Sequence, residues 1–192
     1  WYVDPRILEL ELQTTFANTW QYACRLDQVR EPGEYVTLEL AGEPLLIVRG
    51  SDQVLRGFFN VCRHHAAAVM TEPAGCVKRL TCPYHGWTYT LEGALKAAPA
   101  FENVRNFDPT SNGLVPVSTS IWENWVFVRI APDSASIAEY LGPAVAAQRA
   151  AVDVLHHQVG LVGVGHRVED LHHVRVVQPP HQGRLGGEEA FE

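Results

Sequence analysis

Two short segments decide the fold: NVCRH at residues 60–64 and CPYHGW at residues 82–87. The first has the pattern Cys-x-His and the second has the pattern Cys-x-x-His, with seventeen residues between His64 and Cys82. Each segment therefore offers one thiolate and one imidazole, which are both good ligands for transition metals. Four such side chains can close around one inorganic centre.

The four candidate ligands are Cys62, His64, Cys82 and His85. A mixed set of two cysteines and two histidines favours a [2Fe–2S] cluster in which the cysteines hold one iron and the histidines hold the other. Neutral imidazoles donate less charge than thiolates, so they raise the reduction potential above that of an all-cysteine cluster. The alternative is a structural zinc site, but such sites usually begin with two cysteines about two to four residues apart.

The surrounding residues resemble a known family. Residues 59–67 and 82–89 are similar to the Rieske segment of the large (alpha) subunits of ring-hydroxylating oxygenases, and the resemblance extends from Trp1 to about Gly142. Respiratory Rieske proteins carry an extra cysteine beside each ligand pair, and this chain has none there. His65 stands where the family often has arginine, and we interpret it as a neighbour of the ligands and not as a ligand.

The sequence predicts a mainly β fold, a Rieske-type domain of antiparallel sheets with an N-terminal helix and an irregular C-terminal tail. Residues 4–20 are expected to be helical, because Asp4 before Pro5 is a typical helix start and an apolar stripe follows. Alternation at residues 35–40 and further short runs bounded by turns then predict strands at residues 35–40, 45–49, 54–59, 77–81, 87–90, 94–95, 114–118 and 125–130. We divide the chain into a helical lead-in (1–33), the Rieske [2Fe–2S] domain (34–143) and an atypical tail (144–192).

Aromatic side chains are expected to pack around the centre and to limit the access of water. They are Phe58, Phe59, Tyr84, Trp87 and Tyr89. Tyr84 is the one hydroxyl donor expected beside the ligands. Few hydrogen bonds to the sulfurs leave the reduced cluster less stabilised, so we predict a potential near the low end of the Rieske range, about −150 mV.

The tail has a different character, because six of the nine histidines lie between His156 and His181. The family would have its catalytic domain here, with a mononuclear iron held by two histidines and a carboxylate. The family spacing, a carboxylate followed by histidines three and eight residues later, is absent. Asp170 precedes His173 by three, but the next position in the pattern is Gln178. We therefore expect the tail, residues 144–192, to be disordered or truncated. Because the first residue is Trp1 and not methionine, we expect the chain to be a fragment or a processed product.

Composition limits the cellular setting. A net charge of −7 argues against nucleic acid and anionic membranes as partners. No apolar run approaches the length that spans a bilayer, and the start of the chain has no signal-peptide character. Four cysteines are too few for a secreted disulfide framework, so Cys24 and Cys76 are expected to be free thiols. These features predict a cytoplasmic protein.

The resemblance implies the electron-accepting part of an oxygenase alpha subunit. In that family an NAD(P)H-dependent reductase or a ferredoxin passes electrons to the [2Fe–2S] cluster, which relays them to a mononuclear Fe(II) that activates O2. The complete enzyme is an oxidoreductase, a mono- or dioxygenase expected to be a homo-oligomer, that acts on aromatic compounds or on quaternary amines such as choline or carnitine. The alternative is a stand-alone Rieske ferredoxin-type electron carrier, which usually lacks the N-terminal helix.

Overall fold

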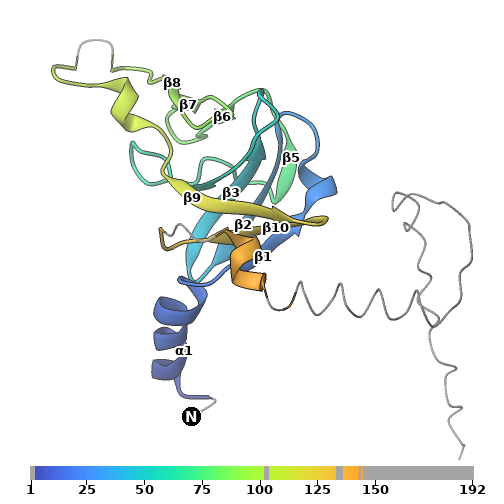
Figure 1. Cartoon of the computed structure of the whole chain (residues 1–192). Helices are drawn as coiled ribbons and strands as arrows, with labels where there is room; N and C mark the ends of the chain where they lie inside the picture. The colour runs from blue at the N-terminus through green and yellow to red at the C-terminus, as the bar shows by residue number, and fades with distance from the viewer. Residues whose placement is uncertain (1–2, 102–103, 133–135, 143, 145–192) are drawn as a thin grey trace, which may run out of the picture. The chain divides into compact units, whose positions relative to one another are not determined.

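A computed structural model describes residues 3–101, 104–132, 136–142 and 144 (Figure 1). Its strands are β1 (Gln21–Arg25), β2 (Glu34–Leu40), β3 (Glu43–Arg49), β4 (Leu55–Phe59), β5 (Ala74–Cys76), β6 (Leu80–Thr81), β7 (Thr88–Tyr89), β8 (Leu95–Ala97), β9 (Pro116–Trp122) and β10 (Trp125–Arg129). Its helical segments are α1 (Pro5–Glu11), a π-helical turn η1 (Leu12–Phe16) and two 3-10 turns, η2 (Leu26–Val29) and η3 (Pro109–Asn112). The mainly β prediction is confirmed.

The helix starts as predicted but ends early. The Asp4 carboxylate accepts a hydrogen bond from the backbone N–H of Arg6 at 3.0 Å, and Pro5 occupies the first helical position. The predicted helix over 4–20 stops at Phe16, because side chains near its end compete for backbone carbonyls. The Asn18 amide donates to the carbonyls of Gln13 and Thr14 at 3.0 and 2.8 Å.

Two antiparallel sheets form the domain. The larger has the strand order β1-β10-β9-β4-β3-β2-β5, and the smaller has the order β6-β7-β8. The first strand, β1, lies within residues 1–33, so the large sheet begins inside the segment that we expected to be a helical lead-in. The domain boundary that we drew at residue 34 stays a prediction.

Of the predicted strand over 77–81 only Leu80–Thr81 (β6) is found, because the chain leaves one sheet and joins the other within this range. β5 pairs with β2, whereas β6 pairs with β7. Val77 between them donates its N–H to the carbonyl of Gly33 at 2.9 Å. Gly33 has a φ of +89°, and a Cβ at this position would overlap the Val77 carbonyl oxygen. Because this contact joins residues far apart in the sequence, the local pattern could not reveal it.

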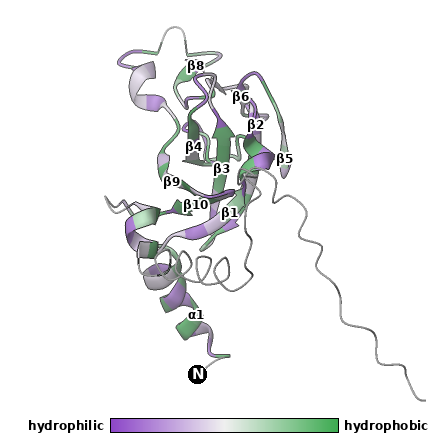
Figure 2. Ribbon diagram, turned by 45° about the vertical axis from the view of Figure 1, so that its right-hand side comes forward, coloured by the Kyte–Doolittle hydropathy of each residue, from purple (hydrophilic) through white to green (hydrophobic). Residues whose placement is uncertain are grey.

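The interior strand β3, between β4 and β2, is buried on both faces and divides two hydrophobic cores. Leu46 and Val48 pack in the core that contains the two segments with the candidate ligands. Leu45 and Ile47 pack in a second core with residues of β10. This burial explains why β3 carries an almost continuous apolar run, which is visible in the hydropathy colouring (Figure 2).

No helix among the residues that the structure describes has the length and apolar character to cross a bilayer. The histidine-rich segment of the tail, including Asp170, His172 and His173, lies outside the described residues.

Candidate metal centre

Two loops of matching backbone geometry carry the candidate ligands. In the first loop, the N–H of Cys62 bonds to the carbonyl of Ala67 at 2.8 Å, and the N–H of Ala66 bonds to the carbonyl of Cys62 at 3.0 Å. The second loop repeats the pattern. The N–H of Cys82 donates to the carbonyl of Trp87 at 2.9 Å, and the N–H of Gly86 donates to the carbonyl of Cys82 at 3.0 Å. The residue four positions after each cysteine has a positive φ, +57° at Ala66 and +74° at Gly86. Each loop therefore folds tightly back on its own cysteine.

A buried side chain, Asn60, holds the first loop in place. It is 4% exposed, and it is the one polar residue classed as buried within the described ranges. Its side-chain oxygen accepts hydrogen bonds from the N–H groups of Val69 and Met70 at 3.1 and 2.9 Å, and its amide donates to the Met70 carbonyl at 2.8 Å. Asn60 thus ties the end of β4 to the far end of the loop. The sequence analysis missed this role.

The structure places the four candidate ligands as two pairs, the thiols of Cys62 and Cys82 and the imidazoles of His64 and His85. Cys62 and Cys82 are each 2% exposed and are free thiols. Burial raises the pKa of the Cys82 thiol, and the neighbouring Cys62 side chain raises it further. The rings of His64 and His85 have centroids 4.8 Å apart, and His85 is exposed whereas His64 is partly buried.

These residues fit a centre with two sulfur and two nitrogen ligands. The Nδ1 atom of His64 is buried and has no hydrogen-bond partner in the described part of the chain. A buried polar atom without a partner costs free energy, and a bound metal ion would satisfy it. The two buried thiols likewise form no disulfide, although they lie side by side. Burial, chemistry and grouping therefore agree with a metal centre.

His65 also lies in this group. A ring nitrogen of His65 is within 4.8 Å of those of His64 and His85, and its ring centroid is 3.9 Å from that of His64. The interpretation of His65 as a neighbour of the ligands stays a prediction. Its exposed position sets it apart from the buried thiols.

Aromatic packing shields one side of the centre. The ring of Trp87 is stacked on that of His64, with centroids 4.9 Å apart and an interplanar angle of 2°. Phe101 meets His64 edge-on at 5.3 Å. Trp87 is buried, as are Phe58 and Tyr89, which confirms the expected packing for these three. Tyr84 is 64% exposed and is therefore not a core residue, although its ring centroid lies 3.9 Å from that of His85.

Tyr89 is the hydroxyl beside the thiols, where we had expected Tyr84. Its oxygen lies 3.3 Å from the Cys62 sulfur and accepts the N–H of Arg63 at 3.0 Å. Either atom could donate in the contact with the sulfur, and the hydroxyl must be the donor when Cys62 is a thiolate, which has no hydrogen. Burial raises the pKa of Tyr89, and the neighbouring Cys62 raises it further, so the hydroxyl stays protonated and can donate. Alternation along β7 from Trp87 could have indicated this inward position.

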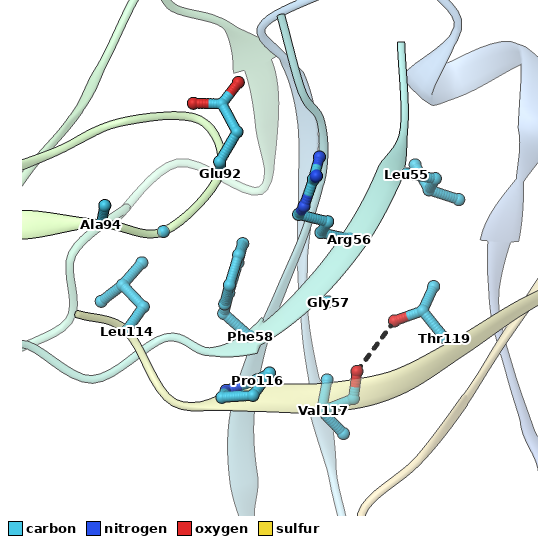
Figure 3. A pocket seen from close by; sticks show the side chains of 11 residues that line it. Leu55, Arg56, Gly57, Phe58, Glu92, Ala94, Leu114, Pro116, Val117 and Thr119 are labelled. Atoms are coloured by element: carbon cyan, nitrogen blue, oxygen red, sulfur yellow. Dashed lines mark hydrogen bonds between the residues drawn. The ribbon is translucent and has the colours of Figure 1, made fainter. Parts of the chain in front are cut away.

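A separate hollow of 490 Å³ lies between β4, β9 and the turn before β8 (Figure 3). Phe58 and Val117 contribute apolar walls, and Arg56 and Glu92 supply charged groups. None of the four candidate ligands lines it. The metal centre is therefore distinct from this hollow.

Comparison with known proteins agrees with this geometry. Residues 19–108 match the family model described as the Rieske [2Fe-2S] domain. The chain is 36% identical over 140 residues to a carnitine monooxygenase oxygenase subunit from Escherichia coli (strain K12), and 34% identical over 140 residues to a glycine betaine monooxygenase oxygenase subunit from Chromohalobacter salexigens. Each match covers 73% of this chain. The matched regions make up 37% and 31% of the two relatives, so the chain spans about a third of their length.

Solved structures show the same likeness. The quaternary ammonium Rieske monooxygenase CntA, in complex with L-carnitine, has a TM-score of 0.69 and 30% identity, with 72% of this chain and 39% of that chain covered. A naphthalene 1,2-dioxygenase from Rhodococcus sp. has a TM-score of 0.69 and 27% identity, with 72% and 32% covered. The chain therefore contains a Rieske [2Fe-2S] domain and is a relative of the oxygenase (alpha) subunits of Rieske oxygenases.

Proposed function

We propose that this chain is the electron-accepting Rieske part of an oxygenase alpha subunit, with its [2Fe–2S] cluster bound by Cys62, His64, Cys82 and His85. When bound, such a cluster accepts and releases one electron. The observation that carries the assignment is that two loops of matching geometry each supply one buried free thiol and one imidazole, with the two thiols neighbouring each other and the two imidazoles adjacent. Asn60 and the turns at Ala66 and Gly86 orient the ligands, while Trp87 and Phe101 keep water from one side of His64.

The two histidines differ from the cysteines in their access to solvent. His85 is exposed, and the His64 ring lies next to it. In our proposal these imidazoles face the electron acceptor, because the thiols are enclosed by the core. The donor would be an NAD(P)H-dependent reductase or a ferredoxin, and the acceptor would be a mononuclear Fe(II) that activates O2.

The substrate class that we favour is a quaternary amine. Relatives at 34–36% identity are named as carnitine and glycine betaine monooxygenase oxygenase subunits. Aromatic compounds are the second candidate, since the naphthalene dioxygenase has the same TM-score as CntA. The test is to purify the complete oxygenase with its reductase and to measure product formation from carnitine, glycine betaine and naphthalene. Turnover of naphthalene alone would contradict a quaternary amine as the substrate class. We also propose a cytoplasmic location and a homo-oligomeric complete enzyme.

Replacing Tyr89 by phenylalanine is expected to lower the reduction potential by about 40 mV. A hydrogen bond to the Cys62 sulfur stabilises the reduced, more negative cluster. A hydrogen bond of this kind contributes about 1 kcal/mol, and losing that contribution lowers a one-electron reduction potential by about 40 mV. Because Tyr89 supplies a donor that the sequence analysis overlooked, we now propose a potential above the low end of the Rieske range. Redox titration of the purified protein measures both values.

The matched control is Tyr84→Phe, which removes an exposed hydroxyl and is expected to leave the potential unchanged. Equal potentials for Tyr89→Phe and the unaltered protein, at unchanged iron and sulfide content, would contradict the assigned hydrogen bond.

Deleting residues 144–192 is expected to leave the cluster intact. The tail lacks the family spacing for a mononuclear iron site, whereas the four candidate ligands lie in the sheet domain. Iron content, sulfide content and reduction by dithionite should match those of the full chain, with one class of bound iron in both. A second, high-spin ferrous iron at about one per chain, lost on deletion or in His172→Ala and His173→Ala, would show that the tail is a catalytic site.

A further inference from the structure

The charge of the chain is distributed unevenly around the proposed centre. Residues 60–101, which contain both ligand loops and the small sheet, carry four Lys and Arg against two Asp and Glu, a net charge of +2. The rest of the chain carries eleven Lys and Arg against twenty Asp and Glu, which gives a net charge of −9. The ligand-loop segment is therefore a positive region on an acidic protein.

Three cations of this segment gather at one hollow. The only two lysines in the sequence are Lys78 and Lys96, and both line a 190 Å³ hollow together with Arg79. All three are exposed, and within the described ranges none of their side chains makes an ion pair or a hydrogen bond. The one carboxylate there, Glu92, already accepts hydrogen bonds from the backbone N–H and the hydroxyl of Ser51. The cations are thus available to an external anion.

The small sheet, β6-β7-β8 (Figure 1), carries Lys96 of the hollow in β8 and Tyr89, the neighbour of the Cys62 thiol, in β7. Arg79 lies three residues before Cys82, so their Cα atoms are at most about 11 Å apart. Thr90 lines the hollow and directly follows Tyr89, whose hydroxyl is 3.3 Å from the Cys62 sulfur. A protein bound over these cations would cover the start of the strand that leads to Cys82 and the residue that follows Tyr89.

We propose that Lys78, Arg79 and Lys96 form the docking surface for an acidic electron-donor protein. Opposite charges on two proteins steer their encounter and accelerate association, with a steep dependence on ionic strength. An acidic partner has no comparable attraction to the remainder of this chain, where negative charge predominates. The inference rests on the proposed electron-accepting function. In the transfer, one electron leaves the donor, which is oxidised, and reduces the centre beside Tyr89.

The test compares two double variants that change the net charge equally. Lys78→Glu/Lys96→Glu reverses both lysines, and Arg6→Glu/Arg30→Glu reverses two exposed arginines outside the ligand-loop segment. The probe is a reduced plant-type [2Fe–2S] ferredoxin of net negative charge, whose potential lies below the Rieske range. Stopped-flow spectroscopy at low ionic strength gives the second-order rate constant for reduction of the full, cluster-loaded chain.

We expect the Lys78→Glu/Lys96→Glu variant to lower this rate constant at least tenfold and to flatten its salt dependence. The Arg6→Glu/Arg30→Glu variant should change the rate constant less than about threefold. Equal slowing by both pairs, no slowing by the lysine pair, or no salt-dependent reduction of the unaltered protein would overturn the docking surface. Iron and sulfide analysis and full reduction by dithionite are measured in parallel. A chain that holds no cluster in any form would instead refute the proposed function itself.

Discussion

Replacing Cys62 or Cys82 by serine is expected to abolish the cluster and to destabilise the domain strongly. A serine oxygen is a poor substitute for a thiolate at an iron site, and both cysteines are 2% exposed in the core that surrounds the ligand loops. Because metal binding is coupled to folding, loss of the cluster removes several kcal/mol of stability. We expect the melting temperature to fall by on the order of 10 °C. Visible absorbance, iron and sulfide content, and thermal unfolding measure the effect.

Cys76→Ser is the matched control, because Cys76 is an exposed free thiol in β5 and is not a candidate ligand. It should retain iron, sulfide and the melting temperature of the unaltered protein. If Cys62→Ser or Cys82→Ser kept full iron and sulfide content, the ligand assignment would be wrong.

Replacing Asn60 by alanine is expected to destabilise the domain by about 3 kcal/mol and to lower cluster occupancy. The change leaves the N–H groups of Val69 and Met70 and the Met70 carbonyl without their partner in a buried site. Each unsatisfied buried group costs about 1–3 kcal/mol, which relaxation and water reduce in part. The first loop then loses its fixed shape, and Cys62 and His64 no longer stay in position.

Urea unfolding together with iron content tests this prediction. Asn124→Ala is the control, since Asn124 is exposed and no hydrogen bond to its side chain is found in the described residues. It should change stability by no more than about 0.5 kcal/mol. Similar small effects at both positions would show that Asn60 does not hold the loop.

The parts of the fold that the sequence predicted correctly depend on local signals. Alternation of apolar and polar residues marked β2, an apolar run marked β10, and Asp4 with Pro5 marked the start of α1. The cysteine and histidine spacing drew attention to four side chains that the structure places as a pair of thiols and a pair of imidazoles on two loops. Each of these patterns lies within a few residues, where secondary structure and loop chemistry leave a direct trace.

The errors concern contacts between distant segments. The strand over 77–81 breaks because Val77 bonds to Gly33, forty-four residues earlier. Tyr84 and Tyr89 are chemically alike, and only the packing of β7 against the first ligand loop decides which hydroxyl reaches Cys62. Asn60 was read as part of a motif, whereas its partners lie nine and ten residues further along the chain. Side-chain chemistry alone does not indicate such partners.

The most direct test of the central claim is metal and sulfide analysis of the protein purified under anaerobic conditions. Our account predicts a reddish-brown protein with about two irons and two acid-labile sulfides per chain, as a [2Fe–2S] cluster requires. Both should be lost together in Cys82→Ser. Stoichiometric zinc without sulfide in the unaltered protein would contradict the account and would identify the four side chains as a structural zinc site.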